Sequence, residues 1–258
     1  MRIFGLIGYP LEHSFSEHYF LDKFSKEGID DCIYQNFPME DLEGLRELVE
    51  FESNLEGLNV TIPYKTEVLP FLDAVDSKAE QIGAVNTIKI ERDEDDPSEY
   101  TLTGYNTDAH GFKESLKPLL GAQHKEAVVL GTGGASLAVT QVLQELSIPF
   151  LQLSRNPKNE LQMSYDVMDE AIIELSKILI NTTPVGMFPH VDDAPPIPFD
   201  GIRGDHLVYD LIYNPEETLL LKEAKSRGAA IKNGQEMLEL QADRSWEIWN
   251  PPYRKTGG

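Results

Sequence analysis

Four short polar segments in the first half of the chain carry side chains that suit a hydroxylated ligand and proton transfer. They occupy residues 13–16, 59–65, 85–87 and 106–108, and they adjoin apolar runs typical of strands. Ligands of open α/β sheets bind where strands end. The hydroxyl, amide, ammonium and carboxylate groups of these segments therefore indicate a site that binds a small polyol and transfers a proton.

Each segment also has a simpler structural explanation that the sequence leaves open. Ser14 and Ser16 could both grip one carboxylate, but a single serine would also cap the helix expected after them. Lys65 follows Pro63, which ends a strand, and a lysine in that place is often only solvated. Asp108 lies at an expected helix start, where residues 106–108 would serve as a cap.

A glycine-rich turn in the middle of the chain indicates a dinucleotide site. Residues 127–130 are apolar, Gly131, Gly133 and Gly134 follow at once, and a helical pattern covers 135–146. In such a turn one glycine permits the bend and another lets the backbone approach a pyrophosphate, while the helix start offers free N–H groups. Ser136 is small enough to preserve close packing of helix on strand.

The residues after the next expected strand favour NADP over NAD. NAD-binding units usually carry a carboxylate there for the ribose. This chain has Ser154, Arg155 and Asn156, with Lys158 close behind and no carboxylate. A guanidinium and an ammonium can face the 2′-phosphate of NADP. The alternative is that Arg155 belongs only to a surface turn that contains a proline.

Apolar runs alternate with helical patterns along the whole chain, which predicts α/β architecture with parallel sheets. The strands are expected at 2–8, 33–37, 55–62, 85–90, 100–103, 127–130, 150–153, 161–166, 178–180 and 207–209. The helices are expected at 16–27, 40–51, 64–72, 76–82, 108–119, 135–146, 216–227 and 235–249.

Composition narrows the functional classes further. The 258 residues include 44 acidic and 22 basic side chains, for a net charge of −22. Such a surface repels nucleic acid and anionic lipid. No apolar run approaches the roughly 20 residues of a membrane span. Because Cys32 is the one cysteine, no disulfide within the chain is possible, and we expect a cytoplasmic protein. No histidine spacing predicts a metal site.

Eight ordered blocks make the chain resemble the shikimate dehydrogenases over nearly its whole length. They are Gly8-x-Pro10-x-x-His13-Ser14-x-Ser16, Asn59-Val-Thr-Ile-Pro-Tyr-Lys65, Gly83-Ala84-Val85-Asn86-Thr87, Asn106-Thr107-Asp108, Gly131-x-Gly-Gly-Ala135, Asn181-x-Thr183-Pro184-x-Gly186-Met187, Tyr209-Asp210-x-x-Tyr213-x-Pro215 and Gly234-x-x-Met237-Leu238-x-x-Gln241. Any one block is weak evidence, whereas their common order is specific.

The resemblance implies an NADP-dependent oxidoreductase of aromatic amino acid biosynthesis that reversibly reduces 3-dehydroshikimate to shikimate. It implies a two-domain fold, with a substrate domain at 1–104 and 236–258, whose sheet is mostly parallel, and a Rossmann-like NADP-binding domain at 105–235. Lys65 and Asp108 would be the catalytic pair. They would also touch the substrate, together with Ser14, Ser16, Thr61, Asn86, Tyr213 and Gln241. The expected cofactor residues are Gly131, Thr132, Gly133, Gly134, Ala135, Ser154, Arg155, Asn156, Lys158, Leu211 and Gly234.

Departures from the family pattern keep alternatives open. Members usually have proline after the serine at 16 and His-Asn a little later, where this chain has Glu17 to Leu21. Asn-Arg-Thr is common where Ser154-Arg155-Asn156 stands here. An NAD-linked quinate/shikimate dehydrogenase and a non-catalytic sensor of shikimate-like acids are the alternatives. The sequence leaves monomer or homodimer open.

Overall fold

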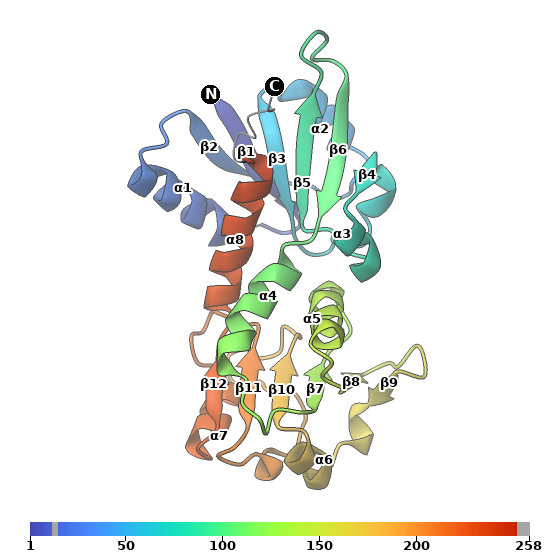
Figure 1. The fold of residues 1–258 in the computed structure, drawn as a ribbon, viewed down its shortest axis with the longest axis vertical. Coiled ribbons are helices and arrows are strands. Elements are labelled where there is room, and N and C mark those ends of the chain that lie inside the picture. Colours follow the sequence, from blue (N-terminus) through green and yellow to red (C-terminus); the bar gives the residue numbers. More distant parts are fainter. Residues whose placement is uncertain (12–14, 252–258) are drawn as a thin grey trace, which may run out of the picture. The chain divides into compact units, whose positions relative to one another are not determined.

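The computed structural model describes residues 1–11 and 15–251 and divides into two compact units (Figure 1). The first unit is Met1–His110 with Gln241–Gly258, and the second is Gly111–Leu240. Each unit is built on one six-stranded sheet. The predicted fold class, two α/β parts of which one is Rossmann-like, is confirmed.

The sheet of the first unit is mixed. Its order is β2-β1-β3-β5-β6-β4, with parallel pairs β1–β2, β1–β3 and β4–β6 and antiparallel pairs β3–β5 and β5–β6. The strands are β1 (Arg2–Gly8), β2 (Cys32–Pro38), β3 (Leu55–Val60), β4 (Ala74–Val75), β5 (Thr87–Arg92) and β6 (Tyr100–Tyr105). The acidic segment between β5 and β6 is the turn of an antiparallel hairpin.

Alternating side chains of β1 show how helices cover both faces of this sheet. Phe4 and Leu6 pack on one face with α1 (Phe15–Glu27) and the C-terminal part of α8 (Gln235–Trp249). Ile7 faces the other way and joins a cluster that includes residues of α2 (Leu45–Phe51) and α3 (Ser77–Ile82). This period of two is what a strand covered on both faces requires.

The sheet of the second unit is all parallel. Its order is β12-β11-β10-β7-β8-β9. The strands are β7 (Ala127–Leu130), β8 (Phe150–Ser154), β9 (Gln162–Ser164), β10 (Ile178–Asn181), β11 (Leu207–Asp210) and β12 (Ala230–Lys232). Counted within this unit, the order is 6-5-4-1-2-3, which is the dinucleotide-binding arrangement with its switch point between β7 and β10.

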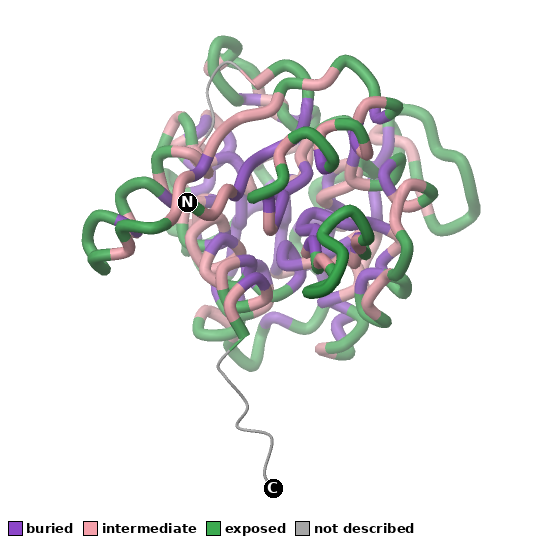
Figure 2. The backbone as a smooth tube through the Cα atoms, turned by 90° about the horizontal axis from the view of Figure 1, so that it is seen from above, coloured by how far each residue is buried: buried purple, intermediate pink, exposed green. Residues whose placement is uncertain are grey.

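Helices again bury the strand faces, and Figure 2 shows the buried segments inside and the exposed ones along outer loops. One face packs on α6 (Glu170–Leu175) and α7 (Leu219–Ser226). The ring of Phe112 from α4 (Asp108–Leu116) packs edge-on against the ring of Tyr209 on β11, with 5.3 Å between the ring centroids. Helix α5 (Gly134–Glu145) follows β7 directly. Short 3-10 turns are η1 (Leu69–Phe71), η2 (Lys117–Leu119), η3 (Tyr165–Val167) and η4 (Phe199–Gly201).

Several predicted elements are wrong or shortened. The helix expected at 64–72 does not form, because the Lys65 carbonyl accepts from the Val85 N–H at 2.7 Å instead of from the next helical turn. A chain of turns ending in η1 replaces it. The helix expected at 40–51 begins only at Leu45, and β5 begins at Thr87 rather than at 85. Strands β4 and β12 and helix α6 were not predicted from the sequence, since each is very short.

None of the helices in residues 1–11 and 15–251 is long and apolar enough to cross a membrane.

Candidate active site

Lys65 and Asp108, predicted as a pair from separate sequence segments, meet in the first unit. The Lys65 Nζ lies 2.7 Å from the Asp108 Oδ2. The side chain of Asp108 is 2% exposed and that of Lys65 is 16% exposed. The carboxylate is therefore screened from water while the ammonium keeps a solvent-facing side, which suits a group that gives a proton to a ligand.

Local backbone contacts fix the position of Lys65. The Val85 N–H donates to the Lys65 carbonyl at 2.7 Å, so the turn after β3 is tied to the segment just before β5. The neighbouring Tyr64 is buried, and its hydroxyl donates to the Met39 carbonyl at 2.6 Å. These two contacts, one on each side of the Lys65 Cα, hold the backbone of Lys65 in place.

Asp108 is held by the start of α4. The Asn106 Oδ1 accepts from the Ala109 N–H at 3.1 Å, so Asn106 caps the helix, and its Nδ2 donates to the Ala84 carbonyl at 2.9 Å. The capping role and the pairing role thus fall on different residues of the same segment. A carboxylate in the first turn also gains from the partial positive charge of the helix N-terminus.

Two of the amides predicted to bind the substrate lie against each other in the same unit. The Asn86 Nδ2 donates to the Gln241 Oε1 at 2.9 Å, joining the residue before β5 to α8. Asn86 is 3% exposed, whereas Gln241 is half-buried. Each of these residues stands in a sequence block from which its role was predicted, although 155 positions separate them in the chain.

The remaining substrate residues are placed as follows. Ser14 lies outside the described residues. Ser16 is half-buried at the start of α1, and its side chain hydrogen-bonds that of Tyr34, whose pKa burial raises well above its ordinary value. Thr61 is half-buried just after β3. Tyr213 belongs to the second unit, and burial raises its pKa.

The glycine turn of the second unit has the shape that a pyrophosphate requires. Gly131 has φ +107°, and a Cβ there would lie 2.8 Å from Thr182 Oγ1, so only glycine suits the position. Gly133 precedes α5 without a side-chain cap, and a Cβ built on it meets nothing within 4 Å. The approach to the N-terminus of α5, where a helix has N–H groups without intrahelical partners, is therefore open at Gly133.

Polar contacts hold this turn in place. The Gln152 Nε2 donates to the Gly131 carbonyl at 3.0 Å and to the Ser136 Oγ at 3.2 Å. Thr132 Oγ1 lies 3.3 Å from Ser154 Oγ, which ties the turn to the end of β8. Thr132 is exposed, and Gly134 and Ala135 are partly exposed at the helix start. The turn is thus rigid and accessible, as a nucleotide cradle must be.

Two cations, Arg155 and Lys158, lie just after β8. Both are exposed, as is Asn156 between them. Within the part of the chain that the structure describes, no ion pair involves Arg155 or Lys158. In a chain with 44 acidic residues, that leaves their charge available to an anionic ligand.

Leu211, which follows β11, and Gly234, which comes shortly after β12, lie against each other. A Cβ on Gly234 would fall 2.0 Å from the Leu211 carbonyl oxygen, so this backbone approach depends on glycine. Nearby, the buried Asp210 carboxylate accepts from Thr218 Oγ1 at 2.7 Å, Asn181 Nδ2 at 3.0 Å and the Ile212 N–H at 3.1 Å. Burial nevertheless raises the pKa of Asp210 to about 6, and these three hydrogen bonds offset it only in part.

A set of buried polar residues surrounds Asn86; three of them stand in the polar segments that the sequence indicated, without a role of their own, and Tyr34 and Ser245 were not singled out. Its members are Tyr34, Asn59, Thr87, Thr107 and Ser245. Thr87 and Thr107 stood inside the motif blocks, and a polar residue in an otherwise apolar strand was the available signal. Ser245 had no such signal, because a serine on the last helix has no distinguishing neighbours.

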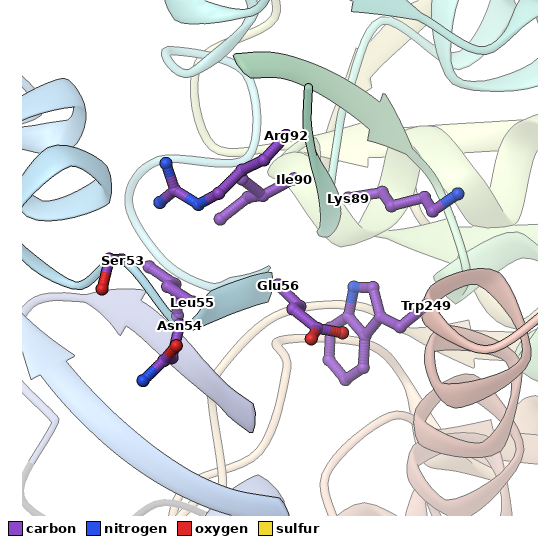
Figure 3. Close-up of a pocket in the computed structure, with 8 residues that line it drawn as sticks. All are labelled: Ser53, Asn54, Leu55, Glu56, Lys89, Ile90, Arg92 and Trp249. Atoms are coloured by element: carbon purple, nitrogen blue, oxygen red, sulfur yellow. The ribbon is translucent and has the colours of Figure 1, made fainter. Parts of the chain in front are cut away.

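A surface pocket of the first unit lies apart from these buried polar residues. A pocket of about 240 Å³ opens at the beginning of β3, lined by Ser53, Asn54, Leu55, Glu56, Lys89, Ile90, Arg92 and Trp249 (Figure 3). It is at the end of β3 opposite to Asn59 and includes neither Lys65 nor Asp108. Among residues 1–11 and 15–251, no group of three or more His, Cys, Asp or Glu is arranged to hold a metal ion.

Comparisons with known proteins agree with this geometry. A family model described as the shikimate dehydrogenase substrate binding domain matches residues 6–88. A shikimate dehydrogenase (NADP(+)) of Methanococcus vannielii is 37% identical over 272 residues, covering 96% of this chain and 90% of that protein.

Solved structures match over nearly the whole chain. The shikimate 5-dehydrogenase of Thermus thermophilus in complex with NADP(H) and shikimate has a TM-score of 0.83 at 29% identity, covering 99% of this chain and 95% of that one. A quinate dehydrogenase of Corynebacterium glutamicum in complex with NAD has a TM-score of 0.85 at 27% identity, covering 97% and 94%. The fold thus serves both nicotinamide cofactors.

Proposed function

This chain belongs to the shikimate dehydrogenase family, as its motif blocks predict, and we propose that it catalyses the reversible, NADPH-dependent reduction of 3-dehydroshikimate to shikimate. The observation that carries the activity is the close pair of Lys65 and Asp108, with 2.7 Å between Nζ and Oδ2, in the unit that the substrate-domain model matches. A protein that only sensed such acids would not need an acid/base pair.

Ketone reduction adds a hydride to carbon and a proton to oxygen. When bound, the reduced nicotinamide supplies the hydride. Lys65 donates the proton to the carbonyl oxygen and stabilises the negative charge that develops there. Asp108 holds the ammonium in place through the hydrogen bond at 2.7 Å. In the reverse direction the same pair takes the hydroxyl proton.

The substrate contacts remain proposals. Asn86 and Gln241 would bind ring hydroxyls, because they present amides next to each other, just before β5 and on α8. Thr61 would bind the same side of the ring. Ser14, Ser16 and Tyr213 would hold the carboxylate, a role that the family resemblance assigns to them.

The cofactor contacts rest on the second unit. Gly131 to Ala135 would cradle the pyrophosphate, and Leu211 and Gly234 would also line the cofactor. NADP is the cofactor named for the relatives, and Arg155 and Lys158 would face its 2′-phosphate, with Ser154 and Asn156 as neighbours. The physical support for this assignment is an exposed guanidinium that pairs with no carboxylate among the described residues.

Other expectations also stay predictions. They are the domain limits 1–104 with 236–258 and 105–235, the cytoplasmic location, and the state as monomer or homodimer. Sedimentation equilibrium of the purified chain decides the last of these.

A single absorbance assay tests the function. NADP reduction is followed with shikimate, then with quinate, and both are repeated with NAD. We expect shikimate with NADP to give the highest kcat/KM. Faster turnover of quinate with NAD would replace the proposal by the activity named for the Corynebacterium glutamicum protein. Tight shikimate binding without turnover by either cofactor would indicate a sensor.

A further inference from the structure

Three buried hydroxyl groups form a triangle inside the first unit. Thr87 Oγ1 lies 2.8 Å from Ser245 Oγ, Thr107 Oγ1 lies 3.2 Å from Ser245 Oγ, and the two threonine oxygens are 3.3 Å apart. All three residues are 0% exposed. They come from β5, from the residue before α4 and from α8, so the hydroxyl triangle joins three elements that are remote in sequence.

One amide supplies the triangle with hydrogen-bond donors. The Asn59 Nδ2 lies 3.0 Å from Ser245 Oγ and 3.2 Å from Thr87 Oγ1. The buried Tyr34 hydroxyl donates to the Asn59 Oδ1 at 2.8 Å, which fixes the orientation of that amide. Asn59 and Thr87 also face each other in the β3–β5 register, so the amide cannot move away without disturbing the sheet.

The triangle touches the amides proposed to bind the substrate. The Asn86 Oδ1 accepts from the Thr107 N–H at 2.7 Å, and the Asn86 Nδ2 donates to Thr107 Oγ1 at 2.9 Å. On the other side, Ser245 Oγ donates to the Gln241 carbonyl at 2.9 Å, one helical turn earlier. The hydroxyls therefore contact both the Asn86 side chain and the backbone that carries Gln241.

These contacts determine which way both amides point. The Asn86 oxygen must face the Thr107 N–H, so its nitrogen must face Gln241 and meets the Gln241 Oε1 at 2.9 Å. With the Gln241 oxygen occupied, its Nε2 is the group left to point outward. Within residues 1–11 and 15–251, no hydrogen-bond partner of the Gln241 Nε2 is found.

We propose that Thr87, Thr107 and Ser245 are positioning residues that fix the Asn86 and Gln241 amides, so that the site offers Gln241 N–H donors to ring hydroxyl oxygens of the substrate. This proposal rests on the proposed function. Rotation of either amide would present an acceptor in place of a donor. Buried networks hold such an orientation only when each member is satisfied, so losing one hydroxyl loosens the whole set.

Isosteric variants separate positioning from mere stability. Thr87→Val removes the hydroxyl at nearly constant volume, Thr87→Ser keeps it, and Ser245→Ala removes another member of the triangle. Ser115→Ala is the matched control, because Ser115 is buried, bonds a carbonyl four residues earlier and meets the Tyr209 hydroxyl at 2.8 Å in the second unit. For each protein we would measure kcat, both KM values and the melting temperature.

We expect Thr87→Val and Ser245→Ala to raise the KM for shikimate about tenfold, with kcat and the KM for NADP within about threefold of wild type. Thr87→Ser should restore the KM, and Ser115→Ala should lower only the melting temperature. An unchanged KM for shikimate in Thr87→Val and Ser245→Ala, with a lowered melting temperature, would overturn the proposal. If one of the two fails to fold, the other still decides.

Calorimetric titration with shikimate keeps this test separate from the test of the enzyme activity. If the wild type binds shikimate without turnover, the proposed function fails. Weaker binding by the hydroxyl-deletion variants would still support the positioning role, and equal binding would refute it. If the wild type does not bind shikimate at all, both proposals fall together.

Discussion

Replacing Lys65 by alanine tests the pairing with Asp108 most directly. The change removes the proton donor and leaves an Asp108 side chain that is 2% exposed without its cation at 2.7 Å. A positioned acid or base contributes about 10²- to 10⁴-fold to a rate. We therefore expect kcat to fall by about that factor, while the KM for shikimate changes only a few-fold, because other side chains hold the ligand.

The assay is steady-state NADP reduction at saturating cofactor, with stability measured in parallel. Removing one member of a buried ion pair can cost about 3–5 kcal/mol, and the partial exposure of Lys65 makes the lower end of that range the expected upper limit. Lys89→Ala is the matched control, because Lys89 is 19% exposed, lies in the same unit and pairs with Glu91 at 2.5 Å. A Lys65→Ala enzyme with a rate near that of Lys89→Ala would refute the assignment.

Three further predictions concern the second unit. Arg155→Ala should raise the KM for NADPH by about 10- to 150-fold and leave the KM for NADH unchanged, because it removes a charge-assisted bond to the 2′-phosphate. Gly133→Ala should leave the melting temperature unchanged, since a Cβ there meets nothing within 4 Å, but it should weaken NADP binding by occupying the approach of the pyrophosphate. Asp210→Asn should change how stability depends on pH. Burial raises the folded-state pKa of Asp210 to about 6 from an ordinary 3.8, so folding favours the protonated carboxyl. The protonated Asp210 carboxyl contributes fully to stability below about pH 4, and this contribution is lost as the pH rises through about 6. The free energy of unfolding of the wild type should therefore fall, relative to that of Asp210→Asn, by up to about 3 kcal/mol between about pH 4 and pH 7.

Each of these has a clear contrary result. An unchanged kcat/KM for NADPH would make Arg155 a turn residue only. A lowered melting temperature in Gly133→Ala would show that this glycine serves the fold rather than the ligand. Parallel pH-stability curves for wild type and Asp210→Asn would mean that the buried carboxyl does not titrate in this range. Chemical denaturation at several pH values gives the last comparison.

The sequence predicted most elements correctly where a long apolar period or a clear stop signal was present. Strand β7, the glycine turn and helix α8 fall where the pattern placed them. The failure at 64–72 has a tertiary cause, since the Val85 N–H takes the carbonyl that a helix would use. The 230–232 strand depends on its neighbour β11 for pairing, which no local pattern records.

For the site, the sequence indicated the chemistry but not the supporting contacts. Lys65 and Asp108 were recognisable because each stands in a block with neighbours of fixed type. Ser245 was not, because its importance comes only from Thr87 and Thr107 beside it, and both lie more than a hundred positions away. Asp210 lay in a recognised block, yet its perturbed pKa follows from burial that only the fold creates.

The sequence by itself determined the types of group available: one nucleotide turn, cations suited to a 2′-phosphate, and an ammonium with a carboxylate for proton transfer. It did so because side-chain chemistry and local backbone preference are properties of short segments. The tertiary structure alone decided that Nζ of Lys65 and Oδ2 of Asp108 lie 2.7 Å apart, and that three buried hydroxyls meet beside the Asn86 amide. Distances and burial arise only when segments remote in the chain pack together, and both the strength of an ion pair and the direction of an amide depend on them.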